Sequence, residues 1–198
     1  MTRPLFTALL FALAPLPATA DEPKKPDYFP LAKGHKWEYI AEVGDTKEDF
    51  IITVTAVKTE NGKTTATRRI NDMGREREED VTVGPDGVLG NLLPGLMADR
   101  RITLLKYPVK PRDTWTEKFQ IKDQDIIALS SVKEAEEVKV PAGTFQAVAV
   151  ETGVLAGEGK DSLGITTWYA NGTGMVKMKL VAGEKAVTVQ LKKFTPGK

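Results

Sequence analysis

The stretch Val138–Val150, reading Val-Lys-Val-Pro-Ala-Gly-Thr-Phe-Gln-Ala-Val-Ala-Val, decides the fold class. Proline fixes its own φ and glycine adopts a positive φ without steric cost, so Pro141-Ala142-Gly143 predicts a tight turn. Residues that favour strands lie on both sides of this turn. The stretch therefore predicts a β-hairpin.

The same pattern of short strands and glycine turns continues in both directions. Asp49–Val57 alternates between two faces, and Asn61-Gly62 after it is a strong signal for a two-residue hairpin loop. The more polar Lys63–Ile70 is interpreted as a returning strand at a sheet edge. No stretch sustains a helical period. The chain is therefore predicted to be all-β, with an antiparallel curved sheet that forms a half-barrel, a barrel or a two-lobed sandwich.

Two segments carry separate expectations. Residues 1–20 combine Arg3, an apolar run and a small-residue cleavage pattern, so they are predicted to be a signal peptide removed before Asp21. Residues 21–26 are expected to be a flexible lead-in to a single β domain over 27–198. For residues 91–101, one helical turn and a loop covering the end of the core both stay open.

The chain contains a candidate internal repeat. Setting Ile52 against Ile127 also sets Val54 against Leu129, and the two halves would then be 27–105 and 106–198. An ancestral duplication would produce this match, and so would the strand pattern by itself.

Charge and composition exclude several function classes. Arg3 is the only charged residue among the first 20, so the rest of the chain, with 27 acidic residues, is formally neutral. Mixed, neutral charge gives no footprint for nucleic acid or for an anionic membrane. The alternating charges of Arg75–Asp80 are interpreted as the solvent-facing side of a strand. With no cysteine and one histidine, the usual zinc and copper sites are out of reach.

No catalytic motif is present. His35, the only histidine, is interpreted as a surface residue, and the chain has no Gly-x-Ser-x-Gly nucleophile motif. Asp123 and Asp125 flank a turn, where paired carboxylates could serve a hydrolase, although a solvated loop is the favoured interpretation. We therefore expect no catalytic residue, no metal and no cofactor, and a non-enzymatic protein is favoured over an enzyme.

The aromatic residues are the remaining candidates for function. On strands they are most often core, but part of the set could line a concave apolar cavity. The residues assigned to ligand binding on this hypothesis are Trp37, Tyr39, Trp115, Phe119 and Trp168.

Three segments together resemble a known group of proteins. They are Tyr28-Phe-Pro-Leu-x-x-Gly34-x-x-Trp37-x-Tyr39, Val140-Pro-Ala-Gly-Thr-Phe145 and Trp168-Tyr-Ala-x-Gly-x-Gly174-Met-Val-Lys177. They resemble a broad group of uncharacterised bacterial exported proteins, to which no biochemical activity is attached. In general form the chain is also remotely similar to envelope half-barrels of the lipoprotein-carrier type, a similarity that implies a curved sheet around an apolar cavity.

Three functions follow as hypotheses. The favoured one is an exported envelope protein, periplasmic or extracellular and without a transmembrane segment after cleavage, that binds an apolar small molecule, a lipid or a partner segment in its sheet. The second is a scaffold component that pairs with an envelope protein through a strand edge. The third is a hydrolase that uses Asp123 and Asp125.

Overall fold

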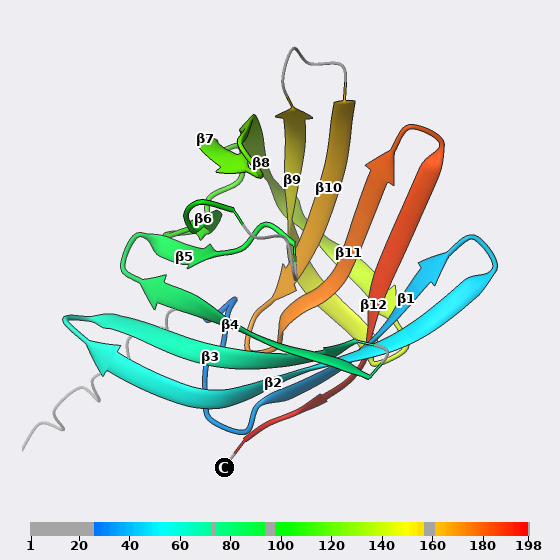
Figure 1. The fold of residues 1–198 in the computed structure, drawn as a ribbon. Coiled ribbons are helices and arrows are strands. Elements are labelled where there is room, and N and C mark those ends of the chain that lie inside the picture. The colour runs from blue at the N-terminus through cyan, green and yellow to red at the C-terminus, as the bar shows by residue number, and fades with distance from the viewer. Residues whose placement is uncertain (1–25, 73, 94–97, 157–160, 198) are drawn as a thin grey trace, which may run out of the picture.

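A computed structural model describes residues 26–72, 74–93, 98–156 and 161–197, and all twelve of its strands belong to one antiparallel sheet (Figure 1). The strands are β1 (Lys36–Val43), β2 (Thr46–Glu60), β3 (Lys63–Asp72), β4 (Arg75–Gly84), β5 (Gly87–Gly90), β6 (Ile102–Lys106), β7 (Thr114–Ile121), β8 (Gln124–Val140), β9 (Gly143–Ala156), β10 (Asp161–Ala170), β11 (Gly174–Ala182) and β12 (Lys185–Thr195). The prediction of an all-β antiparallel fold is confirmed. The predicted signal peptide, and all of the lead-in except Pro26, lie outside the described residues.

The sheet consists of two six-stranded meanders joined at its centre. Strands β1 to β6 follow one another on one side, β12 to β7 on the other, and β1 pairs with β12 between them. The sheet curls until β6 and β7, its two ends, approach each other, which produces a nearly closed barrel (Figure 1). One face of every strand then lies inside, where alternate residues form the core.

The hairpin predictions hold at residue level. Val140 pairs with Gly143, which has a φ of 134°, so Pro141 and Ala142 form the loop between β8 and β9. Asn61 and Gly62 connect β2 to β3 with φ values of 50° and 72°. Both central residues of a type I′ turn have positive φ, which is why this dipeptide is a reliable signal.

One sequence-based expectation needs correction, and one open alternative can be compared with the structure. The polar strand β3 is not an edge, because it is hydrogen-bonded to β2 on one side and to β4 on the other. The described parts of the segment between β5 and β6, residues 91–93 and 98–101, contain no helical turn. Leu92 packs against the core there, as a covering loop would.

The residue alignment of the two halves does not hold in space. Ile52 faces the core at 4% exposure, whereas Ile127 lies on the outer face at 37%. Val54 is buried and Leu129 is exposed in the same way. The alignment therefore sets inward positions against outward ones, because strands of period two look alike in sequence at either phase.

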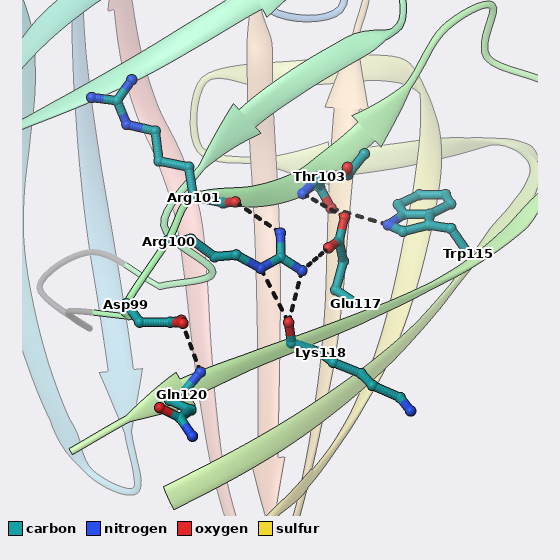
Figure 2. Close-up of polar contacts among 8 residues, drawn as sticks. All are labelled: Asp99, Arg100, Arg101, Thr103, Trp115, Glu117, Lys118 and Gln120. Carbon is teal, nitrogen blue, oxygen red and sulfur yellow. Dashed lines mark hydrogen bonds and ion pairs between the residues drawn. The ribbon is translucent and has the colours of Figure 1, made fainter. Parts of the chain in front are cut away.

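The two ends of the sheet are joined by side chains, as Figure 2 shows. The Thr103 amide of β6 donates to Glu117 Oε1 of β7 at 3.2 Å, and Trp115 Nε1 donates to the Thr103 carbonyl at 3.0 Å. Arg100 Nη2 donates to the Lys118 carbonyl at 2.7 Å and to Glu117 Oε2 at 2.6 Å. We call this junction of β6 and β7 the seam.

A backbone contact adds to the seam. Asp99 donates its amide to the Gln120 carbonyl at 3.0 Å, and the Gln120 amide donates to Asp99 Oδ1 at 2.8 Å. Several backbone groups at both ends of the sheet thus have a hydrogen-bond partner within the chain. This is one of the ways in which proteins prevent a free strand edge from pairing with another molecule.

Candidate ligand cavity

A cavity of about 70 Å³ lies inside the curved sheet. Its lining comes from the segment before β1, from β1, β2, β3, β4, β6, β10 and β11, and from the loop after β5. The lining residues are Phe29, Pro30, Trp37, Tyr39, Ile52, Arg68, Glu79, Asn91, Leu92, Leu104, Thr167, Tyr169, Gly174, Met175 and Met178. The wall is mostly apolar, with one arginine and one carboxylate.

Two aromatic residues of the wall are held in place by hydrogen bonds to the backbone. Trp37 Nε1 donates to the Thr173 carbonyl at 2.7 Å, and the Tyr39 hydroxyl donates to the Met175 carbonyl at 2.9 Å. Burial raises the pKa of the Tyr39 and Tyr169 hydroxyls far above the ordinary value, although the charge of Arg68 opposes this effect in both cases. Both hydroxyls are therefore neutral at any physiological pH.

Arg68 and Glu79 form an ion pair on the inner face of the sheet. They are direct partners in the ladder between β3 and β4, and their side chains are only 12% and 6% exposed. Neighbouring inward positions are the buried Ala66 and Val81, so the period of the two strands carries both charged side chains inward.

The carboxylate of this pair has more hydrogen-bond partners than the guanidinium has. Asn91 Nδ2 donates to Glu79 Oε2 at 3.3 Å, so both carboxylate oxygens have a partner. The guanidinium carbon of Arg68 lies 5.5 Å from the centre of the Phe29 ring. Arg68 Nε is buried and has no hydrogen-bond partner.

This arrangement corrects the interpretation of Arg75–Asp80 as a solvent-facing run. Glu78 and Asp80 do face outward, but Glu79 between them lies inside the barrel. Moving two charged side chains from water into the interior carries a desolvation penalty that two apolar side chains of the same size would not have. A buried ion pair is therefore weak evidence for a role in stability. A buried donor without a partner is uncommon and calls for an explanation.

A second, larger hollow lies on the outer side of the same pair. It measures about 680 Å³ and is lined by polar and charged residues, among them Thr67, Glu78, Asp80, Arg100 and Arg101. Glu79 and Asn91 line both this hollow and the interior cavity. They therefore stand between the apolar interior and a charged exterior.

The structure brings together two of the five residues assigned to ligand binding. Trp37 and Tyr39 line the cavity. Trp115 and Phe119 are buried on the inner face of β7, at the seam, and do not line it. Trp168 lies on the outer face of the sheet, where its indole donates to Glu136 and the Lys177 ammonium lies 5.0 Å from the ring centre.

The residues considered for catalysis lie elsewhere. Asp123 and Asp125 are exposed at the turn between β7 and β8, where Asp125 Oδ1 accepts a hydrogen bond from Gln120 at 2.8 Å. His35 is half-buried, not a free surface residue: its Nδ1 accepts a hydrogen bond from the Gly197 amide at 2.7 Å. Burial lowers the pKa of His35, and the charge of Asp27 opposes this only in part.

Arg68, Glu79 and Asn91 were not found from the sequence. The signal was present, because Arg68 stands between Ala66 and Ile70, and Glu79 stands two residues before Val81, at core positions of their strands. A charged residue at a core position of an alternating strand indicates a buried polar group. The partner of each is fixed only by the register of β3 and β4.

The described residues contain neither a candidate metal cluster nor a candidate membrane helix. Within the described ranges, no group of three or more His, Cys, Asp or Glu side chains is placed to hold a metal ion. Across the same ranges, no helix has the length and apolarity needed to cross a membrane.

Comparison with known proteins gives matches in structure only. No family model and no curated protein match the chain. The fold is similar to that of a Parabacteroides distasonis protein described as a lipoprotein, with a TM-score of 0.65 and 13% identity over 87% of this chain and 100% of that one.

Two further structures are similar. A Bacteroides fragilis protein, described as exported and as having a YmcC-like fold, gives a TM-score of 0.64 and 14% identity over 86% of this chain and 100% of that one. Escherichia coli YmcC, described as a hypothetical lipoprotein, gives 0.42 and 13% over 82% and 85%. At these identities the first two matches establish the fold alone.

Proposed function

We propose that this chain is an exported, non-enzymatic protein of the bacterial envelope that holds an apolar ligand inside its curved sheet. The observation that carries the proposal is the interior cavity, whose wall is aromatic and aliphatic apart from one arginine and its partners. Sites for small molecules have this composition: a mostly apolar wall with a few placed polar groups.

Export is supported by two observations. Residues 1–20 have the pattern of a signal peptide. Two proteins that share the fold are described as a lipoprotein and as an exported protein. The mature protein would then begin at Asp21.

The binding energy would come from burying apolar ligand surface, at roughly 25 cal/mol per Å². The cavity has room for one small organic group, and a longer chain requires the wall to yield. Met175 and Met178 suit that requirement, because methionine side chains are unbranched and adapt to different shapes.

Filling the cavity tests this proposal. In Met178→Trp the larger side chain occupies the cavity, so binding of an apolar fluorescent probe such as N-phenylnaphthylamine should weaken at least tenfold. Leu129→Trp is the matched control, because Leu129 is 50% exposed on the outer face. Equal probe affinity in both variants and the unchanged protein, with the fold intact by circular dichroism, would show that the cavity is not the site.

Native mass spectrometry identifies the cargo. The protein purified gently from its envelope should carry an added mass that disappears on extraction with organic solvent. A bare monomer that also fails to bind the probe would turn the search from small molecules to protein partners.

One observation favours strand pairing as a second candidate. In β4 the partner β5 covers only Thr82–Gly84, and no described strand pairs with Arg75–Val81 on that side. This edge is rich in charge, which disfavours unselective pairing. Under the second candidate, gel filtration would show a discrete oligomer that Glu78→Pro disrupts, because proline removes a backbone donor and reshapes the edge.

A further inference from the structure

We infer that the cavity selects an uncharged molecule with an apolar body and one hydrogen-bond-accepting oxygen, such as an ester or amide carbonyl, and that Arg68 binds this oxygen. The inference rests on the proposed function and adds the chemical class of the ligand. It is argued from which donors and acceptors of the cavity wall already have a hydrogen-bond partner and which do not.

Arg68 is a donor of the cavity wall that has buried capacity left over. A guanidinium carries five N–H donors, and here one nitrogen bonds Glu79 while Nε has no partner. The Tyr39 hydroxyl is already committed to the Met175 carbonyl, and Trp37 Nε1 to the Thr173 carbonyl. Because the Arg68 side chain lines the cavity, a ligand oxygen there would gain a charge-assisted hydrogen bond from its guanidinium.

Glu79 offers nothing equivalent to a ligand donor. Arg68 occupies its Oε1 and Asn91 its Oε2. Each oxygen of Glu79 thus already accepts one hydrogen bond, whereas Arg68 Nε has none. The buried group that lacks a hydrogen-bond partner is a donor, which favours a ligand that accepts a hydrogen bond.

The charge balance of the cavity selects against ions. The Arg68–Glu79 pair is neutral as a unit, and a buried charge without a counterion is strongly unfavourable. A carboxylate ligand would add a second negative charge to the guanidinium that Glu79 already neutralises, and an ammonium would add a positive one. A carbonyl supplies the acceptor without either cost.

The positions of the interior cavity and the outer hollow indicate how the ligand would be oriented. Glu79 and Asn91 line both the interior cavity and the charged outer hollow, so the carbonyl end would lie on the side of the outer hollow. The apolar body would point the other way, toward Ile52, Trp37 and Met178.

The test compares four probes with the same eight-carbon chain: methyl octanoate, octanoate, octylammonium and octane. Each displaces N-phenylnaphthylamine from the full-length processed protein at pH 8. Methyl octanoate should bind about tenfold or more tightly than octanoate or octylammonium, since either ion would add a buried charge without a counterion. Equal or tighter binding of octanoate would overturn the inference in favour of an anionic ligand.

A pair of double variants locates the effect. Arg68→Met/Glu79→Leu removes the inner pair without leaving a lone buried charge, which is often tolerated. Arg69→Met/Glu78→Leu removes the neighbouring ladder pair on the outer face, where the side chains are 49% and 54% exposed. The inner variant should lose about tenfold for methyl octanoate and nothing for octane, and the outer variant should lose neither.

The outcomes separate the inference from the proposed function. If octane and methyl octanoate bind equally to the unchanged protein, the cavity is a binding site but Arg68 does not select the ligand. If neither binds, nor the fluorescent probe, the proposed function itself is wrong. Urea unfolding of both double variants confirms that the comparison is made on folded protein.

Discussion

Two Arg–Glu ion pairs in this barrel differ in location, exposure and hydrogen-bond partners. Arg68–Glu79 lies inside, between adjacent strands, and Arg100–Glu117 lies at the seam, between the two ends of the sheet. The inner pair is 12% and 6% exposed, and the seam pair 46% and 15%. The seam pair also bonds backbone groups, the Lys118 carbonyl and the Thr103 amide, whereas the inner arginine keeps a donor without a partner.

This difference suggests a structural role for the seam pair and a binding role for the inner pair. At the seam, charged side chains replace ladder hydrogen bonds and hold the sheet closed, so each donor and acceptor finds a fixed partner. Inside, β3 and β4 already pair through their backbones, and the ion pair is not needed to join them. Its incomplete hydrogen bonding is the observation on which the proposed ligand contact rests.

The largest expected effect comes from breaking the inner pair on one side only. Glu79→Leu leaves the Arg68 charge buried without its counterion, which should lower the free energy of unfolding by about 3–5 kcal/mol. Urea unfolding measures it. Glu78→Leu, one residue away on the outer face, is the control and should change little. If both substitutions cost the same, Arg68 reaches water and the cavity is wetter than described.

A smaller effect is expected at the seam. Glu117→Ala removes the acceptor of the Thr103 amide and a partner of Arg100, so the free energy of unfolding should fall by about 1–3 kcal/mol. Hydrogen exchange at the Thr103 amide should accelerate, while exchange in the paired centre of β10 and β11 should not.

Lys118→Ala is the control for the seam. Lys118 contributes only its backbone carbonyl to the junction, so this change should leave both the unfolding free energy and the Thr103 exchange nearly unaltered. If exchange at Thr103 is already fast in the unchanged protein, the seam is open in solution and the ends of the sheet are free.

The smallest expected effect is on the pH dependence of stability. Burial alone would raise the pKa of Glu117, but hydrogen bonds from Thr103 and Arg100 outweigh it and hold the pKa below the ordinary 4.5. The ionised form is thus favoured by folding, so its contribution is present above pH 4.5 and is lost as the pH falls through the lower, folded value. Between pH 6 and pH 3, stability should fall more steeply in the unchanged protein than in Glu117→Gln. Parallel slopes would show that the carboxylate gains nothing from the seam.

Local patterns predicted much of this fold. Turns such as Asn61-Gly62 and Pro141-Ala142-Gly143 are decided within a few residues, and alternation identifies strands wherever apolar residues mark the inner face. Prediction failed where the inner face is polar. Every residue of Arg75–Asp80 is charged, so no apolar side chain marks the inner face and no local pattern indicates that Glu79 points inward.

The long-range features could not be predicted for a related reason. The pairing of β1 with β12 joins residues about as far apart as the domain allows, such as Lys36 and Thr195. The seam depends on how tightly eleven earlier pairings curl the sheet. The aromatic residues were correctly assigned to strands, but the choice between core and cavity for Trp37 and Trp115 depends on that curvature.

The pairing of β1 with β12 also determines when the protein can fold. Each six-stranded meander can begin to form from neighbouring hairpins, but the middle of the sheet is complete only once the last strand is present. Contacts this distant along the chain slow folding, because a long loop must close before they contribute. A chain exported from its N-terminus would thus carry a β1 paired with β2 alone until its C-terminal end emerged, so the sheet would be completed on the far side of the membrane only after translocation.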